Sequence, residues 1–261
     1  LVLTDEQWAV LEPLLEACRP PAKVPPRHLR RTVSAILWRH ANGAKWRAIP
    51  DAFGPWWVGG LPPTRETFIR WSRLGEWERL LAMAQARGVE RGLAFVDGTS
   101  IRAHQKAAGA TKTAPLRRNG VLVRRSAVSG GYGTKACVIA DGADGPSPSF
   151  WPPGPAHELP RAAPLLARLP DAPLWGVADR GDSSRALRDH IWIWNLGARP
   201  AIPPQANEAP VACPEPISNN RNRVGGPGTA PDRAVATRYE KTARSCLGVL
   251  CLAATIDWLR R

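Results

Sequence analysis

Two short apolar runs, each followed directly by an aspartate, constrain the fold of this chain more than any other feature. Residues 93–96 and 174–178 contain the β-branched and aromatic residues that are typical of buried strands. Asp97 follows the first run and Asp179 the second, and Asp97-Gly98 predicts the end of the first strand. An amphipathic segment over about 184–192 follows the second run. Strand, loop and helix in this order predict an α/β domain, in which ligands bind at the carboxyl ends of strands.

Two carboxylates at strand ends suggest a metal site. Mg²⁺ prefers oxygen ligands and keeps water molecules that take part in phosphate chemistry. Taken alone, Asp97-Gly98 is more typical of a turn between two strands. The second aspartate favours the metal interpretation, so we take Asp97 and Asp179 as candidate catalytic residues and metal ligands.

The N-terminal part of the chain carries the periodicity of short helices. Thr4 and Gln7 fit a capping box at the start of the first helix. Further helices are expected over about 29–41, 64–71 and 76–86, and basic residues lie on the third helix. This pattern predicts a small all-α, helix-turn-helix-like unit. A helical bundle with a solvated basic face is the alternative.

The charge balance indicates a polyanionic partner. The chain has 36 Lys and Arg against 22 Asp and Glu, a formal net charge of +14 and a pI of about 10.7. Residues 98–140 contain no acidic residue, and eight basic ones stand there. A stretch whose charges are all positive is typical of a protein surface that contacts the DNA backbone. A disordered basic loop over 111–129, a ribosome-type basic protein and codon bias towards arginine are the alternatives.

Other classes of protein are disfavoured by missing patterns. The five cysteines are widely spaced without a Cys-x-x-Cys pair, which predicts reduced, buried thiols of a cytosolic protein. No segment is long and apolar enough for a membrane span, and no secretory pattern opens the chain. Residues 131–136 match G-x-G-x-x-A, but a strand-like run follows, so we reject a dinucleotide site. The sequence lacks the G-x-S-x-G nucleophile elbow, the motif that would indicate a serine hydrolase.

Several short motifs occur together in one order along most of the chain. They are Leu3–Trp8, Trp46–Pro50 and Phe68–Trp71 in the N-terminal part, then Val96–Thr99, Gly131–Lys135, His157–Pro160, Ala178–Gly181 and Ala236–Ala243. In this combination the chain resembles the DDE transposases of bacterial insertion sequences, in the branch called the insertion-sequence-five family.

The resemblance implies a helical DNA-binding region over 1–90 and a ribonuclease H-like α/β domain, a mixed sheet flanked by helices, over 91–261. In this family two Asp and one Glu hold two Mg²⁺ or Mn²⁺ ions, and Asp97 and Asp179 match the two Asp. The implied activity is DNA strand cleavage and strand transfer. The implied partner is double-stranded DNA at element ends and target, bound by a homo-oligomer in the cytoplasm, associated with the nucleoid and not with a membrane.

The third carboxylate of the family is missing from its expected place. The family's Glu position is Gly225, in a Gly- and Pro-rich stretch that cannot continue a helix. Glu208, Glu215 and Glu240 are the possible replacements. Residues 111–129, 147–155 and 225–232 have the composition of degenerate, out-of-frame segments. We therefore expect a catalytically impaired copy; a non-catalytic DNA-binding remnant and a metal-dependent nuclease on the same core are the alternatives.

The basic residues that we expect to contact DNA are spread over both regions. They are Arg65, Arg70, Arg73, Arg102, Lys106, Lys135, Arg180, Arg221, Arg238 and Lys241.

Overall fold

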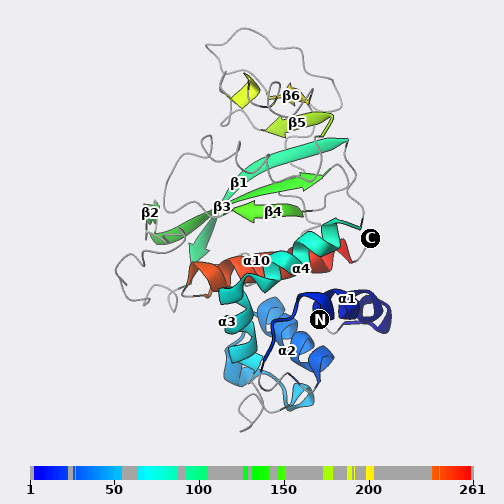
Figure 1. Ribbon diagram of the computed structural model, residues 1–261. Coiled ribbons are helices and arrows are strands. Elements are labelled where there is room, and N and C mark those ends of the chain that lie inside the picture. The colour runs from blue at the N-terminus through cyan, green and yellow to red at the C-terminus, as the bar shows by residue number, and fades with distance from the viewer. Residues whose placement is uncertain are drawn as a thin grey trace. The chain divides into compact units, whose positions relative to one another are not determined.

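The computed structural model describes residues 3–22, 26, 28–54, 64–87, 92–104, 126–128, 131–141, 146–150, 173–178, 187–189, 191, 198–202, 237–240 and 242–259. The chain divides into two compact units (Figure 1). The helical unit comprises Leu1–Ala84, Ile101–Leu122 and Pro231–Arg261, and the sheet unit comprises Gln85–Ser100 and Val123–Ala230. Each unit is described by itself below.

The helical unit contains the four N-terminal helices that the periodicity predicts. They are α1 (Asp5–Cys18), α2 (Leu29–Asn42), α3 (Thr64–Leu74) and α4 (Glu76–Gln85), with the 3₁₀ turns η1 (Trp46–Ala48) and η2 (Asp51–Phe53) after α2. The predicted capping box is present, because Thr4 Oγ1 accepts from the Gln7 amide and the Gln7 side chain accepts from the Thr4 amide, each at 3.2 Å. Gly43 ends α2 with a left-handed φ of +58°.

The connections between these helices differ from those of a helix-turn-helix. That motif joins two helices by three or four residues, whereas α2 and α3 are separated by residues 43–63 and α3 and α4 by Gly75 alone, at φ +79°. The predicted all-α unit is therefore confirmed as a group of helices. Among the residues that the structure describes, no two of these helices are joined by the three- or four-residue turn of a helix-turn-helix.

A fifth helix, α10 (Ala243–Trp258), completes the helical unit from the other end of the chain. Before this helix, Thr237–Arg238 form a strand, β7, and the Thr242 hydroxyl caps α10 by accepting a hydrogen bond from the Ser245 amide. Gly248 lies so close to α3 and α4 that an added Cβ would stand 2.6 Å from Ser72 Oγ and 2.8 Å from Trp77 Cδ1. Thus the helical unit is not made of residues 1–90 alone.

A buried ion pair joins α2 to the segment before α10. The Arg39 guanidinium donates to Glu240 Oε1, and the two side chains are only 7% and 13% exposed. Arg39 also donates to the Ala44 carbonyl at 3.0 Å and lies 4.6 Å from the centre of the Trp46 ring. The His40 side chain is buried, with 1% exposed, and its Nδ1 donates a hydrogen bond to the Ile36 carbonyl at 2.7 Å. Its Nε2 lies 3.9 Å from Glu240 Oε1.

Tyr239 packs beside this pair, against two other parts of the helical unit. Its ring stacks on His104 with centroids 4.5 Å apart, and a Cβ on Gly43 would stand 3.1 Å from it. The backbone of the same segment is also paired: Thr237 and Arg238 form a parallel ladder with Arg102 and Ala103. The segment 237–240 is therefore held by strand pairing, ring stacking and an ion pair together.

The sheet has the order β2-β3-β1-β5-β6, with β4 beside β3 and β7 beside β1. Its strands in the sheet unit are β1 (Leu93–Ala103, which ends in the helical unit), β2 (Ser126–Val128), β3 (Gly131–Asp141), β4 (Pro146–Phe150), β5 (Trp175–Ala178) and β6 (Arg199–Ala201). The pairs β1–β5 and β5–β6 are parallel, whereas β2–β3 and β3–β4 are antiparallel. The predicted mixed α/β class is confirmed.

One strand prediction is corrected, and strands occur in two segments of degenerate composition. Asp97-Gly98 does not end β1, which continues to Ala103 because the residues beyond the pair find a ladder partner in β7. Two of the segments expected to be degenerate contain strands: residues 126–128 form β2 and residues 146–150 form β4, both paired with β3. Proline is tolerated in such strands at a sheet edge or next to a bulge, and the β3–β4 register shifts between Cys137 and Ile139. Segment 225–232 lies outside the described residues.

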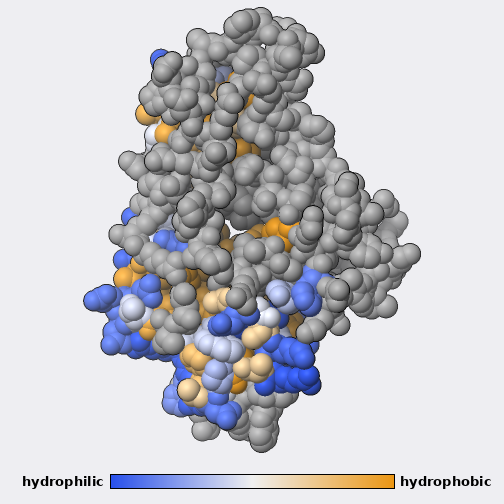
Figure 2. Space-filling view, turned by 180° about the vertical axis from the view of Figure 1, so that it is seen from behind, coloured by the Kyte–Doolittle hydropathy of each residue, from blue (hydrophilic) through white to orange (hydrophobic). Residues whose placement is uncertain are grey.

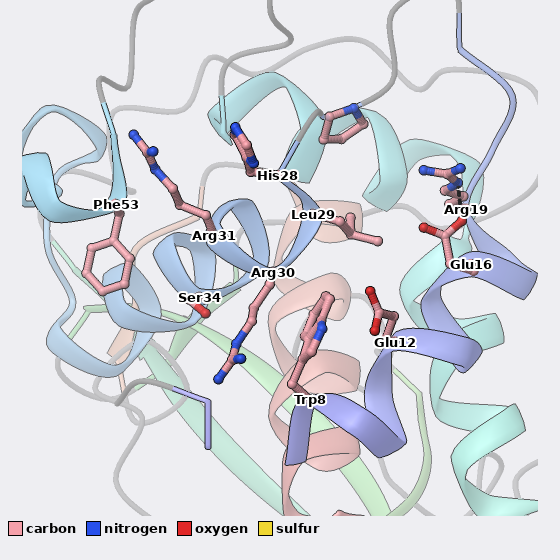
Figure 3. Close-up of a pocket in the computed structure, with 11 residues that line it drawn as sticks. Trp8, Glu12, Glu16, Arg19, His28, Leu29, Arg30, Arg31, Ser34 and Phe53 are labelled. Atoms are coloured by element: carbon pink, nitrogen blue, oxygen red, sulfur yellow. Dashed lines mark ion pairs between the residues drawn. The ribbon is translucent and has the colours of Figure 1, made fainter. Parts of the chain in front are cut away.

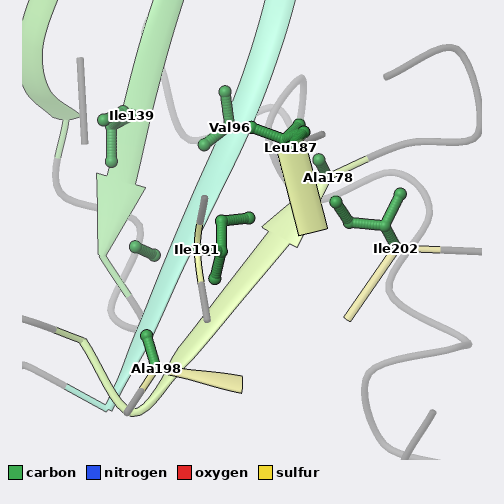
Figure 4. Close-up of a cluster of buried hydrophobic side chains, with 8 residues drawn as sticks. Val96, Ile139, Ala178, Leu187, Ile191, Ala198 and Ile202 are labelled. Carbon is green, nitrogen blue, oxygen red and sulfur yellow. The ribbon is translucent and has the colours of Figure 1, made fainter. Parts of the chain in front are cut away.

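Strand alternation gives the sheet a core on each face. Ala94 and Val96 of β1 join a buried cluster with Ile139, Ala178, Leu187, Ile191, Ala198 and Ile202 (Figure 4). Phe95 belongs to the opposite cluster, with Ala140, Val177 and Ala201. The apolar runs that predict β1 and β5 are therefore buried on both faces, as in parallel strands covered on both sides. None of the described helices is long and apolar enough to cross a membrane.

We expect Gly248→Ala to destabilise the helical unit by up to about 2 kcal/mol, because the new methyl group overpacks a filled core at Ser72 and Trp77 at a cost of about 1–3 kcal/mol. The roughly 1 kcal/mol that alanine gains over glycine in a helix offsets part of this cost. Urea unfolding followed by circular dichroism measures the change. Gly92→Ala is the control, because nothing lies within 4 Å of its added Cβ. Equal midpoints for both variants would contradict the packing described here.

Removing the charge of Glu240 leaves the Arg39 guanidinium buried without a counter-ion. We expect Glu240→Gln to cost about 3 kcal/mol of stability. The double variant Arg39→Met, Glu240→Leu removes both charges and is expected to cost less than Arg39→Met or Glu240→Leu alone. Denaturant midpoints of the parent, these two single variants and the double variant close the cycle. Additive losses would mean that the two side chains do not interact.

Acidification is expected to weaken the helical unit through His40. Burial, and then the nearby Arg39 charge, hold the pKa of His40 well below its usual value of 6.5. The imidazole of His40 therefore stays neutral in the folded protein at a pH where it takes up a proton in the unfolded chain. The free energy of unfolding is for this reason unaffected above about pH 6.5 and decreases as the pH falls below that value. The slope reaches about 1.4 kcal/mol per pH unit at most. Urea midpoints between neutral and acidic pH should fall more steeply for the parent than for His40→Gln; parallel curves would overturn this assignment.

Candidate functional site

One candidate metal ligand lies in β1, and the other follows β5, the parallel neighbour of β1, in the sequence. Asp97 lies within β1, directly after Val96. Val96 is the Cα partner of Ala178, the last residue of β5. Asp179 follows Ala178 in the sequence and lies outside the described residues. The structure therefore fixes the strand register at the two positions that precede the aspartates.

Glu240, one possible replacement for the third ligand, forms an ion pair within the helical unit. Its carboxylate is bound to Arg39, and both residues belong to the helical unit. Glu208, Glu215 and Gly225 lie outside the described residues. Among the side chains that the structure describes, no group of three or more His, Cys, Asp or Glu could hold a metal ion.

The residues expected to contact DNA are described to different extents. Lys106, Arg180, Arg221 and Lys241 lie outside the described residues. The backbone places Arg102 in β1, Lys135 in β3 and Arg238 in β7. Arg65, Arg70 and Arg73 are described in full, and all three lie on the surface of α3.

A groove lies between α3 and the proline-rich segment after α1, with a volume of about 610 Å³. We call it the α3 groove, and it is lined by Arg19, Pro20, Ala22, Pro26, Arg65, Glu66, Thr67, Ile69, Arg70, Trp71, Arg73 and Leu74. Arg70 donates to the Pro21 carbonyl at 2.5 Å, which ties the segment to α3. Sequence reasoning found the three arginines of α3 but not the groove, because its other wall comes from residues nearly fifty positions away.

A second pocket, of about 680 Å³, lies between α1 and the start of α2 (Figure 3). Arg30 lies over Trp8 and pairs with Asp5 at 2.6 Å. Arg31 packs against Gly54, where an added Cβ would stand 1.7 Å from its guanidinium. Glu12 and Glu16 also line this pocket. Its charges are therefore mixed, and the sequence held no signal for it beyond the two adjacent arginines of α2.

Buried ionisable groups elsewhere in the helical unit are explained by packing. Cys18, Cys246 and Cys251 are buried free thiols, as predicted, while the side chains of Cys137 and Cys213 are not described. Burial raises the pKa of Cys18 to about 11, and burial also raises that of Cys251. Such thiols are unreactive, which agrees with a structural role.

Comparison with known proteins identifies both ends of the chain. Residues 3–81 match the model of the IS4/5 transposase family, DUF4096, and residues 177–260 match the model of the transposase DDE domain. A 16.2 kDa protein of insertion element IS402 from Burkholderia cepacia is 30% identical over 129 residues, which are 46% of this chain and 86% of that protein.

Two further proteins are similar at lower sequence identity. The protein y4sN of Sinorhizobium fredii is 28% identical over 110 residues, 42% of this chain and 83% of its own length. The cryo-EM structure of the piggyBac transposase synaptic complex with hairpin DNA aligns with a TM-score of 0.38 and 12% identity, over 84% of this chain and 52% of that one. The two family models and the insertion-element relative together show that this chain belongs to the DDE transposases of insertion sequences.

Proposed function

We propose that this chain descends from an enzyme that cleaves and joins DNA strands with Mg²⁺ or Mn²⁺, and that Asp97 and Asp179 are the ligands it retains. The register of β1 and β5 carries the proposal. Val96 and Ala178 are Cα partners, and each of these residues is followed in the sequence by one of the two aspartates. Because consecutive Cα atoms are about 3.8 Å apart, the two aspartates are confined to one neighbourhood at that position of the sheet.

The alternation of the strands supports the same pairing. Asp97 stands two positions after Phe95, and Asp179 stands two positions after Val177. Phe95 and Val177 share one buried cluster. A strand repeats its faces every two residues, so position 97 of β1 belongs to the same face as Phe95.

The donor set fits a divalent cation in part. Carboxylate oxygens are the ligands that Mg²⁺ and Mn²⁺ prefer, and Asp97 and Asp179 would supply them. When bound, the ions would activate the attacking hydroxyl and stabilise the leaving oxygen. Arginine and lysine side chains would neutralise the DNA phosphates. The glutamate of the family is replaced by Gly225, so the metals would be held by too few carboxylates.

We therefore infer a catalytically impaired transposase that keeps its affinity for double-stranded DNA. A non-catalytic remnant that occupies element ends is the second candidate, favoured by Gly225 and by the engagement of Glu240 with Arg39. Assembly as a homo-oligomer on DNA and a cytoplasmic, nucleoid-associated location belong to the same proposal.

Cleavage of a labelled duplex carrying the element ends, in Mg²⁺ and in Mn²⁺, tests the proposal. We expect the parent to cut weakly or not at all, and Asp97→Asn to reduce any remaining cleavage by more than about 100-fold, since a direct ligand is worth more than an outer one. Both proteins should bind the duplex.

Gly225→Glu is the companion variant, and we expect little rescue because the flanking Gly and Pro residues do not support a helix. Efficient cleavage by the parent that Asp97→Asn abolishes would show that another group completes the site. Cleavage that persists in Asp97→Asn would remove Asp97 from the mechanism.

A further inference from the structure

The α3 groove carries an excess of positive charge. Four guanidinium groups line it, on Arg19, Arg65, Arg70 and Arg73, against the single carboxylate of Glu66. Two of the four are paired: Arg65 with Glu66 at 3.0 Å, and Arg19 with Glu16 at 2.7 Å. Arg70 and Arg73 make no ion pair with another described residue. The groove therefore offers two uncompensated charges to an anion.

Arg70 is already oriented. One of its terminal nitrogens donates to the Pro21 carbonyl at 2.5 Å, across 49 positions of sequence. A guanidinium has five N–H donors, so this bond fixes the side chain and leaves donors for a second partner. An arginine held in this way loses less conformational entropy when it binds a phosphate.

Arg73 lies one turn further along α3, at its end. The Arg73 carbonyl accepts from Arg244 of α10 at 3.1 Å, so the helix end is fixed while the Arg73 side chain is exposed. Residues three positions apart on a helix lie on the same side of it. Arg70 and Arg73 therefore present two cations along one line of the groove.

Thr67 supplies an unused hydroxyl in the same groove. Thr67 is 4% exposed, and its Oγ1 has no hydrogen-bond partner among the described residues. Two other buried helical hydroxyls are satisfied within their own helix: Ser72 donates to Phe68 and Thr255 to Cys251, each at 2.8 Å. Buried polar groups in proteins almost always have a partner. Among the described residues, Thr67 thus offers the groove a hydroxyl for a polar ligand.

Apolar groups complete the surface. Leu74 is 51% exposed at the end of α3, and Trp71 and Ile69 line the groove. Figure 2 shows hydrophilic and apolar side chains side by side over the helical unit. Cations beside apolar surface suit a sugar–phosphate chain, which alternates charged phosphates with less polar sugars. The pocket between α1 and α2 is less suitable, because Glu12 and Glu16 line it.

We propose that the α3 groove binds the phosphodiester backbone of duplex DNA, with Arg70 and Arg73 each contacting a phosphate and the Thr67 hydroxyl bonding a backbone oxygen. This assignment rests on the DNA-binding function proposed above and locates it on one face of the helical unit. It selects Arg70 and Arg73 over Arg65, whose charge is met by Glu66.

The salt dependence of DNA binding by the full chain tests the assignment. Each phosphate contact contributes about 0.9 to the slope of log affinity against log salt concentration. Binding of a mixed-sequence duplex is measured by fluorescence anisotropy from about 50 to 200 mM salt, a range over which one contact is worth about 3.5-fold in affinity. We expect Arg70→Ala and Arg73→Ala each to lower the slope by about one.

Three further variants separate binding from folding. Arg70→Lys keeps the charge and is expected to keep the parent's slope with weaker affinity. Thr67→Val removes a neutral hydroxyl and is expected to weaken binding equally at every salt concentration. Arg30→Ala removes a charge from the same unit outside the groove, and is expected to behave as the parent.

The outcomes separate the two proposals. If the parent binds with a salt-dependent affinity but Arg70→Ala and Arg73→Ala keep its slope, or Arg30→Ala lowers the slope equally, the groove assignment is wrong and DNA binding stands. A parent that does not bind the duplex overturns both.

Discussion

One buried ion pair holds the helical unit together. Arg39 and Glu240 are 201 positions apart in the sequence, and neither charge could stay inside the protein without the other. Pairing them fixes the segment 237–240 against α2. The neighbouring contacts depend on that position: Tyr239 lies between Gly43 and His104, and Thr242 then caps α10 where Gly248 can approach Ser72.

This ion pair also clarifies the chemistry of the site. A glutamate in a motif typical of the family is an obvious replacement for a missing metal ligand, and Glu240 is the one such candidate that the structure describes. Its side chain pairs with an arginine and lies near a neutral histidine, so the proposed metal site keeps Asp97 and Asp179 as its carboxylates.

Local signals in the sequence predict local structure well. The capping box at Thr4, the left-handed Gly43 and the strands at 93–96 and 175–178 are encoded within a few residues. Interactions over long sequence distances decide the rest. Asp97-Gly98 is a turn signal that the ladder with β7 overrides, and residues 146–150 form a strand because β3 lies beside them. Neither Arg39 with Glu240 nor Arg70 with the Pro21 carbonyl has a signature in the sequence.

The place of α10 in the helical unit has a consequence during synthesis. The helices α1 to α4 leave the ribosome early, but the surface around Ser72, Trp77 and Arg39 has no cover until residues 237–258 have also been made. In that interval the nascent helices carry exposed tryptophans and an unpaired arginine, the state in which chaperones and proteases act on incomplete chains. A ribosome that stops early thus releases a helical unit that lacks α10 and cannot close its core.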